Sequence, residues 1–468
     1  MTTADELRAA VPGLVVRDGA ARDEYGRDEG YARLGRDLRP DLVAVPAGTD
    51  QVSAVVRFAA LRRMPVVPWG SGSSLEGQGL ATRGGLTVDL RGMARVRRLL
   101  LDDFQVEVDA GILYDDLNRR LRDHGVFFPP NPGAPATVGG MVSNNSSGSR
   151  AVKYGVTRDY VVALEVVLAD GTMTRLGSRS RKSASGYDLV DLVVGAEGTL
   201  CVVTGAVLRV APTPAVTRGI VAWFPDVATA ASLVQPCLGE GHRPATLELL
   251  DERVARTMAT ISPLDSREGA ALLIECDGPD RAAVDAEVDA VAALVLSVGG
   301  ELQPVDDKGF RAVMAARKTL GRELVRVAGV RTLKLLDVAV PLSAYAATVA
   351  DAYAVLARHD LHGFVLGHAG DGNLHVLIAS DWRDTALWAR TQEAEREIVH
   401  AALAREGTIT GEHGIGAAKR HLLRAEHGVG VDLMAAVKSA FDPNGIMNPG
   451  KILPDPDADG DTVGGGRP

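Results

Sequence analysis

The sequence predicts an α+β protein with two large domains. The chain has 468 residues, which at roughly 150 residues per domain is more than one domain. Up to about Pro212, short apolar strands and helices are separated by glycine-rich loops. Prolines then punctuate the chain, and strand-like runs alternate with much longer helix-like runs. Both regions therefore mix sheet and helix.

The first region opens with a strand that stops at Pro46. A helix follows, in which apolar residues recur at helical spacing from Val52 to Ala60. The dipeptide Asp170-Gly171 is expected to form a tight turn after a later strand. The order of elements is typical of an α+β nucleotide-binding domain. Its strands are expected at 41–45, 64–68, 85–90, 106–109 and 161–168, and its second helix at 115–124.

The second region is expected to form a ferredoxin-like or related layer of sheet and helices. The expected strands are 219–224, 270–276, 333–340, 363–367 and 374–379, and the long helices are 280–298, 343–358 and 385–405. One more helix, 432–441, stops at a proline-containing turn. We expect four segments: 1–212, 213–405, 406–454 and an Asp-, Gly- and Pro-rich tail, 455–468, expected to be disordered.

Composition excludes several classes of protein. A formal net charge of −9 argues against nucleic acid as a partner. The three cysteines form no Cys-x-x-Cys pair, which argues against an iron–sulfur cluster and fits a reducing cytoplasm. Residues 1–30 lack the apolar core of a signal peptide, and no window resembles a membrane span. We expect a cytoplasmic protein, free or peripheral to a membrane.

Three glycine-rich segments suggest a bound ligand. In residues 65–77, Gly70 and Gly72 alternate with serines, so that backbone N–H groups and hydroxyls can surround a diphosphate. Leu75 stands where a Rossmann fingerprint needs its third glycine. Residues 129–149 combine small, hydroxyl and amide side chains, and Gly195-Ala-Glu-Gly-Thr-Leu200 precedes a strand at 201–204. The alternatives are a surface loop for the first segment and a flexible linker for the second.

Together these motifs resemble the FAD-binding domain of vanillyl-alcohol-oxidase type flavoproteins. From about Pro40 to Pro454, the chain resembles the FAD-linked D-2-hydroxyacid dehydrogenases, which include D-lactate dehydrogenases, the glycolate oxidase D subunit and D-2-hydroxyglutarate dehydrogenases. The resemblance implies a two-lobed FAD-binding (PCMH-type) domain and a ferredoxin-like α+β substrate (cap) domain. It implies non-covalent FAD, because residues 65–77 contain no histidine. The implied FAD contacts are Pro68, Gly70, Ser71, Gly72, Ser73, Ser74, Pro130, Gly133, Gly139, Gly140, Ser143, Asn144, Gly148, Ser149, Glu197, Gly198, Val203 and Asn448.

Two further motifs carry histidines. His368 and His375 would lie on opposite faces of one continuous strand, but the glycines between them predict a turn that brings both to one side. Glu412 and His413 follow in a second glycine-rich loop. Two imidazoles and one carboxylate suit a divalent metal, with zinc or manganese favoured. From spacing alone, the alternative is that each histidine is a hydrogen-bonded structural residue.

The resemblance assigns roles within these motifs. It implies His368, His375 and Glu412 as metal ligands, His413 as catalytic base and Asn373 beside the substrate. It also implies that Arg317, in the helix-like segment 314–319, binds the substrate carboxylate; a solvated helix face is the alternative.

The segment Leu335–Pro341 keeps the family's Asp and Pro. The hydroxyglutarate enzymes have a lysine two residues before this Asp, whereas here that position is Leu335 and Lys334 lies one residue away. The departure favours a lactate- or glycolate-like substrate.

The expected reaction is oxidation of a D-2-hydroxy acid to a 2-oxo acid, with hydride transfer to flavin N5. The electrons then pass to a separate acceptor: oxygen, a quinone, a cytochrome or an electron-transfer flavoprotein. Alternatives are a D-2-hydroxyglutarate dehydrogenase, an FAD-binding subunit of a multi-subunit glycolate oxidase, a non-catalytic flavin-binding subunit, a sugar or alditol oxidase and a metal-dependent hydrolase. Whether the chain forms a homodimer stays open.

Overall fold

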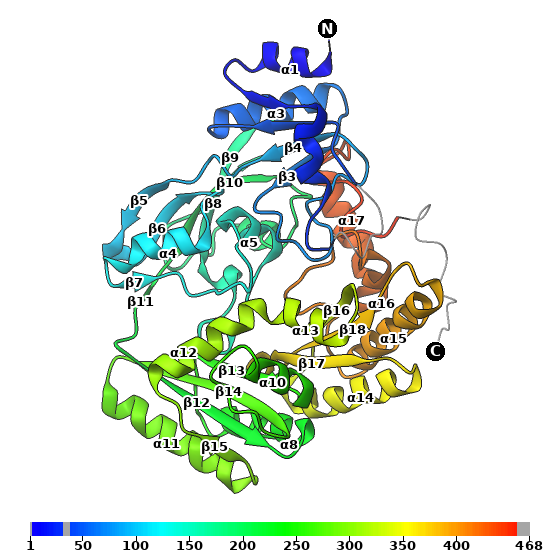
Figure 1. Ribbon diagram of the computed structural model, residues 1–468. Coiled ribbons are helices and arrows are strands. Elements are labelled where there is room, and N and C mark those ends of the chain that lie inside the picture. Colours follow the sequence, from blue (N-terminus) through cyan, green and yellow to red (C-terminus); the bar gives the residue numbers. More distant parts are fainter. Residues whose placement is uncertain (1, 31–37, 456–468) are drawn as a thin grey trace.

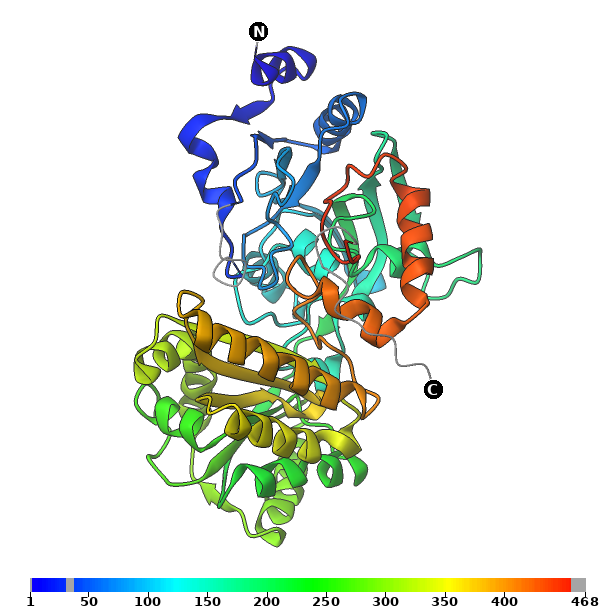
Figure 2. The same cartoon turned by 90° about the vertical axis from the view of Figure 1, so that its right-hand side faces the viewer.

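The computed structural model describes residues 2–30 and 38–455. Figure 1 shows an N-terminal part, blue to cyan, above a green and yellow cap. The C-terminal helices return from the cap to the N-terminal part (Figure 2). Apart from Asp455, the predicted tail lies outside the described residues. In the part of the chain that the structure describes, no helix is long and apolar enough to cross a membrane.

The N-terminal part contains two larger sheets. The first has the order β1 (Val15–Arg17), β2 (Leu42–Val45), β4 (Leu86–Asp89), β3 (Val66–Trp69), with β2 and β3 parallel to β4. The second is antiparallel, with the order β5 (Val96–Leu100), β6 (Gln105–Asp109), β10 (Val202–Arg209), β8 (Val161–Val167), β9 (Met173–Gly177). A short ladder joins β7 (Val126–Phe127) to β11 (Ala211–Pro212).

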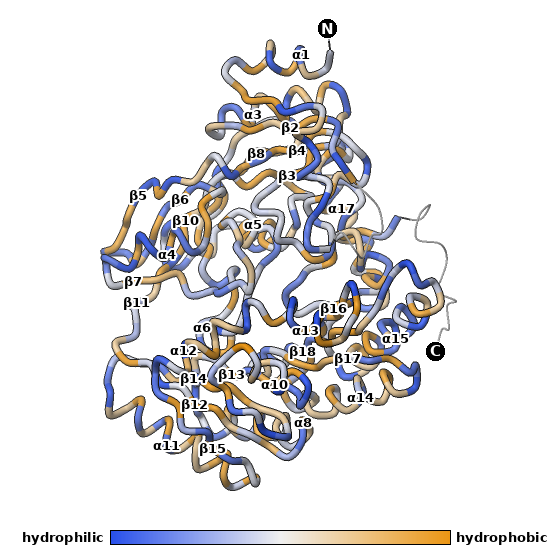
Figure 3. Tube along the Cα trace, in the orientation of Figure 1, coloured by the Kyte–Doolittle hydropathy of each residue, from blue (hydrophilic) through white to orange (hydrophobic). Residues whose placement is uncertain are grey.

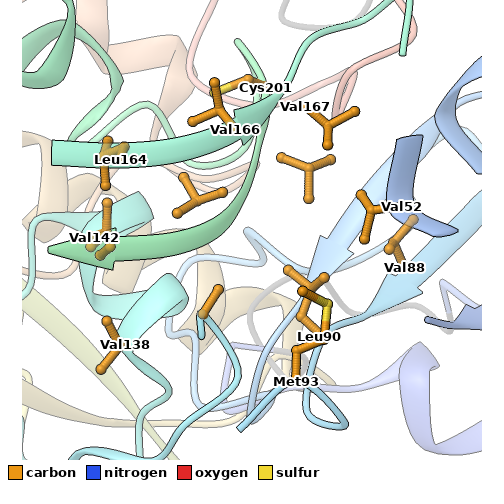
Figure 4. Packing of buried hydrophobic residues seen from close by; sticks show 14 of the residues in the cluster. Val52, Val88, Leu90, Met93, Val138, Val142, Leu164, Val166, Val167 and Cys201 are labelled. Atoms are coloured by element: carbon orange, nitrogen blue, oxygen red, sulfur yellow. The ribbon is translucent and has the colours of Figure 1, made fainter. Parts of the chain in front are cut away.

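One apolar core joins these two sheets. Val52 and Val88 from the first sheet's side and Leu164 and Val166 from the second belong to the same buried cluster (Figure 4). Helices α3 and α5 contribute apolar residues to it, whereas α4 carries many hydrophilic residues (Figure 3). The helices of this part are α1 (Thr3–Ala10), α3 (Thr49–Leu61), α4 (Tyr114–Arg122), α5 (Val138–Asn144), α6 (Ala151–Tyr154) and α7 (Leu189–Val193).

The cap is built on a seven-stranded antiparallel sheet. Its order is β15 (Glu301–Gln303), β12 (Val216–Phe224), β14 (Ala270–Gly278), β13 (Thr246–Leu250), β17 (Gly363–His368), β18 (Asn373–Ser380), β16 (Thr332–Ala339). One face packs on α8 (Val227–Ser232), α9 (Val234–Gly239), α11 (Arg281–Ser297), α14 (Tyr345–Arg358) and α15 (Thr385–Leu403). The other face packs partly on α10 (Glu252–Ala259), α12 (Asp307–Ala316) and α13 (Leu320–Ala328).

Strand alternation gives the cap sheet a functional face. Leu336 and Val338 of β16 point into the apolar cluster, while Asp337 between them points to the opposite face. On β18, Leu374 and Val376 flank His375 in the same way. The polar residues of neighbouring strands therefore gather on the side of the sheet that faces the N-terminal part.

The chain leaves α15, forms the loop that contains Glu412 and His413, and continues into α16 (Leu423–His427) and α17 (Gly430–Phe441). Beyond α17 it rejoins the first sheet, where Val66 N–H donates to the Ile446 carbonyl at 2.7 Å and Asn448 N–H donates to the Val66 carbonyl at 2.7 Å. The same chain segment thus bridges the cap and the N-terminal part.

The fold class expected from the sequence is confirmed, and the expected strands and long helices recur with shifted ends. Several elements lacked a sequence signal, among them β13 and α10. Residues 138–144, expected as part of a glycine-rich segment, form helix α5 with Thr137 as its cap. The predicted segment boundaries stay predictions; the first falls between β11 and β12.

Packing of α12 on β12 yields a testable prediction. A Cβ on Gly219 would lie 1.9 Å from Cγ of the buried Phe310, so Gly219→Ala must displace that ring and should destabilise the cap by roughly 1–3 kcal/mol. The control is Gly321→Ala in α13, where a Cβ meets nothing within 4 Å and stability should stay equal or rise. Denaturant unfolding measures both; equal effects would refute the packing argument.

Candidate active site

The N-terminal part contains a cavity to which its glycine-rich segments contribute much of the lining. Several glycines bring the backbone of these segments close to its neighbours. A Cβ on Gly70 would lie 2.4 Å from Thr137 Oγ1, and one on Gly139 would lie 2.8 Å from the Ala110 Cβ. Gly198 has φ +70°, which suits glycine, and packs against Pro68. Larger residues would disturb the walls of this cavity.

The structure divides the predicted FAD contacts between cavities. Lining the glycine-rich cavity are Pro68, Gly70, Gly72, Ser74, Gly139, Gly140, Ser143, Asn144, Glu197, Gly198, Val203 and Asn448. Gly133, Gly148 and Ser149 line a second cavity instead, and Ser71, Ser73 and Pro130 line neither. The sequence did not single out the lining residues Trp69, Gln78, Gly79, Leu90, Ala110 and Thr137 as contacts. All of these assignments stay predictions.

The second cavity lies between the cap sheet and the N-terminal part. Arg317, His368, His375, Glu412 and His413 all line it. The structure thus brings together at one cavity predicted site residues that lie up to 96 positions apart in the sequence, and their roles stay predictions.

Three imidazoles converge on one carboxylate oxygen. The Nε2 atoms of His368, His375 and His413 lie 3.1, 3.4 and 3.8 Å from Glu412 Oε1. The predicted turn exists: β17 ends at His368, a 3₁₀ turn follows at Ala369–Asp371, and β18 carries His375 back on the same face. The hairpin explains how two histidines seven residues apart both face the Glu412 carboxylate.

The side-chain amide of Asn373 lies beside this cluster, and its NH₂ group is hydrogen-bonded to β16. Its Nδ2 donates to Asp337 Oδ1 at 2.6 Å and to the Val338 carbonyl at 3.0 Å. Its Oδ1 is buried and has no hydrogen-bond partner in the described chain. The predicted place near the substrate therefore stays a prediction that rests on this free acceptor.

Asp337 organises the loop that supplies Glu412 and His413. This fully buried carboxylate accepts hydrogen bonds at Oδ2 from both of their backbone N–H groups at 2.9 Å, and from Thr410 Oγ1 at 2.8 Å. Oδ1 lies 3.6 Å from His375 Nδ1. Asp337 thus holds the backbone of the loop and also places a negative charge beside His375.

The N-terminal part holds the same loop from the other side. Glu197 accepts hydrogen bonds from the backbone N–H groups of Ile415 and Gly416, and Gln78 Nε2 donates to the His413 carbonyl at 2.6 Å. Asn144 Nδ2 donates to the Glu412 carbonyl at 2.7 Å. Because Gln78, Asn144 and Glu197 also line the glycine-rich cavity, that cavity and the histidine cavity share a hydrogen-bonded wall.

Burial and neighbouring charge set the protonation of these groups. Burial lowers the pKa of His413 to about 4, with Asp337 opposing the shift, so its imidazole is neutral at pH 7. Burial disfavours charge on His368 as well, but Glu248 and Glu412 outweigh it and hold its pKa well above the usual value. Burial raises the pKa of Glu197 to about 7, against its two backbone hydrogen bonds.

The donor set fits a divalent cation. Ligand atoms about 2.1 Å from a tetrahedral zinc ion lie about 3.4 Å apart, close to the 3.1 and 3.4 Å that separate Glu412 Oε1 from His368 and His375 Nε2. Two imidazole nitrogens and one carboxylate are also the ligand types that zinc and manganese accept, and a cation would displace the proton that Glu248 and Glu412 favour on His368. The predicted ligands His368, His375 and Glu412 can therefore hold such an ion together.

Two family models match the chain. One, described as FAD binding domain, matches residues 40–177, and another, FAD linked oxidases, C-terminal domain, matches residues 213–452. The fold and the two cavities thus define a flavoprotein oxidoreductase. The chain belongs to the FAD-linked oxidase family and is an enzyme that acts on CH–OH groups.

Relatives support this assignment. A probable mitochondrial D-lactate dehydrogenase of Danio rerio is 36% identical over 440 residues, 93% of this chain and 88% of the relative. The glycolate oxidase subunit GlcD of Bacillus subtilis is 36% identical over 423 residues, 88% of this chain and 89% of the relative. A 4-ethylphenol oxidase structure from Gulosibacter chungangensis, at 18% identity, has TM-score 0.78 and covers 96% of both chains. It shows the vanillyl-alcohol-oxidase fold.

Two charged residues of the site were not predicted. Asp337 was noted only as part of a familiar segment, and Glu248 carried no signal at all. Glu248 is fully buried and contacts both Arg317 and His368. A carboxylate between the leucines of the run 247–250 is the cue that could have found it, because a buried strand rarely carries an unpaired charge.

The glycine-rich cavity makes a prediction for cofactor binding. A side chain on Gly140 would extend into the cavity, since its Cβ has only Thr137 Oγ1, at 3.2 Å, nearby. Gly140→Leu should weaken FAD binding by at least about tenfold, or about 1.4 kcal/mol. The flavin-to-protein absorbance ratio after dialysis measures it. Gly48→Leu, at a position outside this cavity with nothing within 4 Å of the Cβ, should retain FAD; full FAD content in both variants would contradict the assignment.

Proposed function

We propose that this enzyme oxidises a D-2-hydroxy acid to the 2-oxo acid with non-covalent FAD, assisted by a divalent cation held by His368, His375 and Glu412. The observation that carries the proposal is the convergence of three imidazole Nε2 atoms on Glu412 in a cavity that also contains Arg317. A hydroxy acid needs a cationic partner for its carboxylate and a base for its hydroxyl, and this cavity offers both.

The chain's own groups take distinct roles. Arg317 binds the substrate carboxylate through its planar guanidinium. His413, neutral at pH 7, accepts the hydroxyl proton at Nε2, and Asp337, 3.7 Å from its Nδ1, stabilises the resulting imidazolium. Asn373 offers its free Oδ1 to the substrate. Bound FAD supplies the hydride acceptor, and a bound divalent cation lowers the pKa of the substrate hydroxyl.

Part of the cavity wall beyond the histidines is apolar. Leu335, Leu366 and Leu377 line it, and Leu335 pairs directly with Leu377 across two strands. Lys334 lies on the opposite face of the sheet, where its Nζ pairs with Glu395 at 2.6 Å. Arg150, which pairs with Glu275, and Lys318 also line the cavity, so the preference rests on position 335 alone. Because neither Leu335 nor Lys334 supplies a cation there, we favour a lactate- or glycolate-like substrate over a hydroxyglutarate.

Electrons must then leave the flavin for an acceptor outside the chain. All three cysteines are buried singly, far from one another in sequence, so they offer no cluster site. Oxygen, a quinone, a cytochrome or an electron-transfer flavoprotein stays open; a relative from Arabidopsis thaliana, 35% identical, carries the name D-lactate dehydrogenase [cytochrome]. Buried free thiols suit a reducing cytoplasm, our proposed location, and a homodimer stays open.

A second candidate is an FAD-binding subunit of a multi-subunit glycolate oxidase. The similarity to the glycolate oxidase subunit of Bacillus subtilis favours it. This candidate differs in one measurable respect, because flavin reduction by the substrate would then require partner chains.

Anaerobic mixing of the purified flavoprotein with single hydroxy acids tests the proposal. D-lactate or glycolate should bleach the flavin absorbance, D-2-hydroxyglutarate should do so far more slowly, and L-lactate should leave the flavin oxidised. Rate constants come from stopped-flow absorbance. If the flavin stays oxidised with these acids and a wider D-hydroxy-acid panel, the chain alone does not carry this activity.

His413→Ala tests the proposed base. Because general bases contribute about 10²–10⁴-fold, flavin reduction should slow by that factor while FAD stays bound. His124→Ala, at an exposed position in the N-terminal part, is the matched control and should react like the unmodified enzyme. Comparable reduction rates in both variants would remove His413 from the mechanism.

A further inference from the structure

One buried carboxylate contacts two separate functional side chains. Glu248 Oε1 lies 2.6 Å from His368 Nδ1, and its Oε2 lies 2.5 Å from a terminal guanidinium nitrogen of Arg317. The Glu248 side chain is 0% exposed. Each oxygen of the carboxylate therefore contacts a residue with a different proposed role: His368 in cation binding and Arg317 in substrate binding.

Strand register fixes the first contact. β13 pairs with β17 so that Glu248 lies directly opposite His368, and both side chains point to the functional face of the sheet. Paired residues on neighbouring antiparallel strands have Cβ atoms about 5 Å apart, so a Glu and a His in this register meet without strain. The contact is thus a property of the sheet itself and not of a loop.

The second contact brings in a different element. Arg317 follows the last turn of α12, which packs on the same face of the sheet. Its Nε is buried and has no hydrogen-bond partner among the residues that the structure describes. The contact of a terminal nitrogen with Glu248 Oε2 is an ion pair without hydrogen-bond geometry. It holds the guanidinium in place while other donors stay available to a ligand carboxylate.

We propose that Glu248 is a positioning residue that orients Arg317 and His368 together and so makes carboxylate binding and cation binding depend on one side chain. The roles of those two residues rest on the proposed function. Glu248 holds Nδ1–H of His368, which leaves Nε2 as the nitrogen that faces Glu412 and His375. It holds the guanidinium at the cavity wall, where a substrate carboxylate can reach it.

A charge argument explains why one residue can serve both. A buried carboxylate that loses one partner is left partly uncompensated, which costs far more than an exposed ion pair gains. Arg317 and His368 therefore both stay near Glu248, because the departure of either one would leave this buried carboxylate partly uncompensated. If either residue moves away from Glu248, the position of the carboxylate, and with it the position of the other residue, becomes less well fixed.

Glu248→Gln tests this role by removing the charge while keeping the shape. Metal-stripped flavoprotein is titrated with Zn²⁺ alone and, separately, with pyruvate in the absence of metal, each followed by calorimetry or flavin absorbance. We expect both affinities to fall at least about tenfold, the effect typical of residues that orient metal ligands. Glu395→Gln is the matched control: it removes a buried carboxylate on the opposite face of the same sheet, where Lys334 is the partner, and both affinities should stay within about twofold.

Double variants separate positioning from general destabilisation. In an Arg317→Met background, Glu248→Gln should cause no further loss of pyruvate affinity, and in a His368→Gln background no further loss of Zn²⁺ affinity. Full additivity in both backgrounds, or unchanged affinities in the single variant, would overturn the proposal, as would equal losses in Glu395→Gln.

Glu248→Asp serves if Glu248→Gln fails to fold. Its charge is kept, but a side chain one methylene shorter cannot reach both partners, so at least one of the two affinities should fall; unchanged affinities would overturn the proposal. These binding measurements need no turnover. A wild-type enzyme that no hydroxy acid reduces would therefore refute the proposed function while leaving the Glu248 result readable.

Discussion

The active site depends on a loop, and the loop depends on Asp337. A carboxylate with no exposed surface accepts the backbone N–H groups of Glu412 and His413, so the two functional side chains start from a fixed backbone. Burial of this charge would be costly alone, but hydrogen bonds and the nearby His413, His375 and Lys419 more than offset it and lower the pKa of Asp337. The glycines of the loop explain why it needs such an anchor: Gly414 and Gly416 have positive φ, and a flexible backbone holds no ligand geometry by itself.

The second anchor comes from the other domain. Glu197, itself in the left-handed region with φ 51°, accepts from Ile415 and Gly416, while its own carbonyl accepts from Asn448 of the returning C-terminal segment. Three distant parts of the chain therefore meet at one residue. The loop is held between a carboxylate of the cap and a carboxylate of the FAD-binding domain, so the site exists only when both domains are in place. This explains why the chain runs from the first domain through the cap and back: without Asn448 and its neighbours, the wall between the cavities would lack its third support.

Much of this arrangement could be predicted from the sequence, and the rest could not for physical reasons. Periodicity located the long helices, and the glycines between His368 and His375 indicated the turn that places both on one face. Glycine clusters marked the segments that line the glycine-rich cavity, where we predict FAD to bind. They did not indicate α5, because Gly139 and Gly140 are poor helix formers and tertiary packing overrides this preference. Glu248 and Asp337 were missed as site residues because a single carboxylate inside an apolar strand does not indicate a function by itself. Only the strand register shows that they lie opposite His368 and His375. Lys334 is a similar case. It is one residue away from Leu335 in the sequence, but neighbouring residues of a strand point to opposite faces of the sheet, so Lys334 points away from the cavity that Leu335 lines.

Charge balance links the two anchors to the chemistry. Arg317 and His368 compensate Glu248, and Lys419 helps to compensate Asp337. Glu412 pairs with the same His368, whose pKa is held well above its usual value, while His413 is neutral at pH 7. The two carboxylates Glu248 and Glu412 therefore share the positive charge of one imidazole. A divalent cation between Glu412 and the two neighbouring histidines reverses that local balance, attracts the substrate oxygen and lets His413 stay uncharged as a proton acceptor. Cation binding and base catalysis thus support each other: the cation supplies positive charge at Glu412, while His413 stays neutral and able to accept a proton.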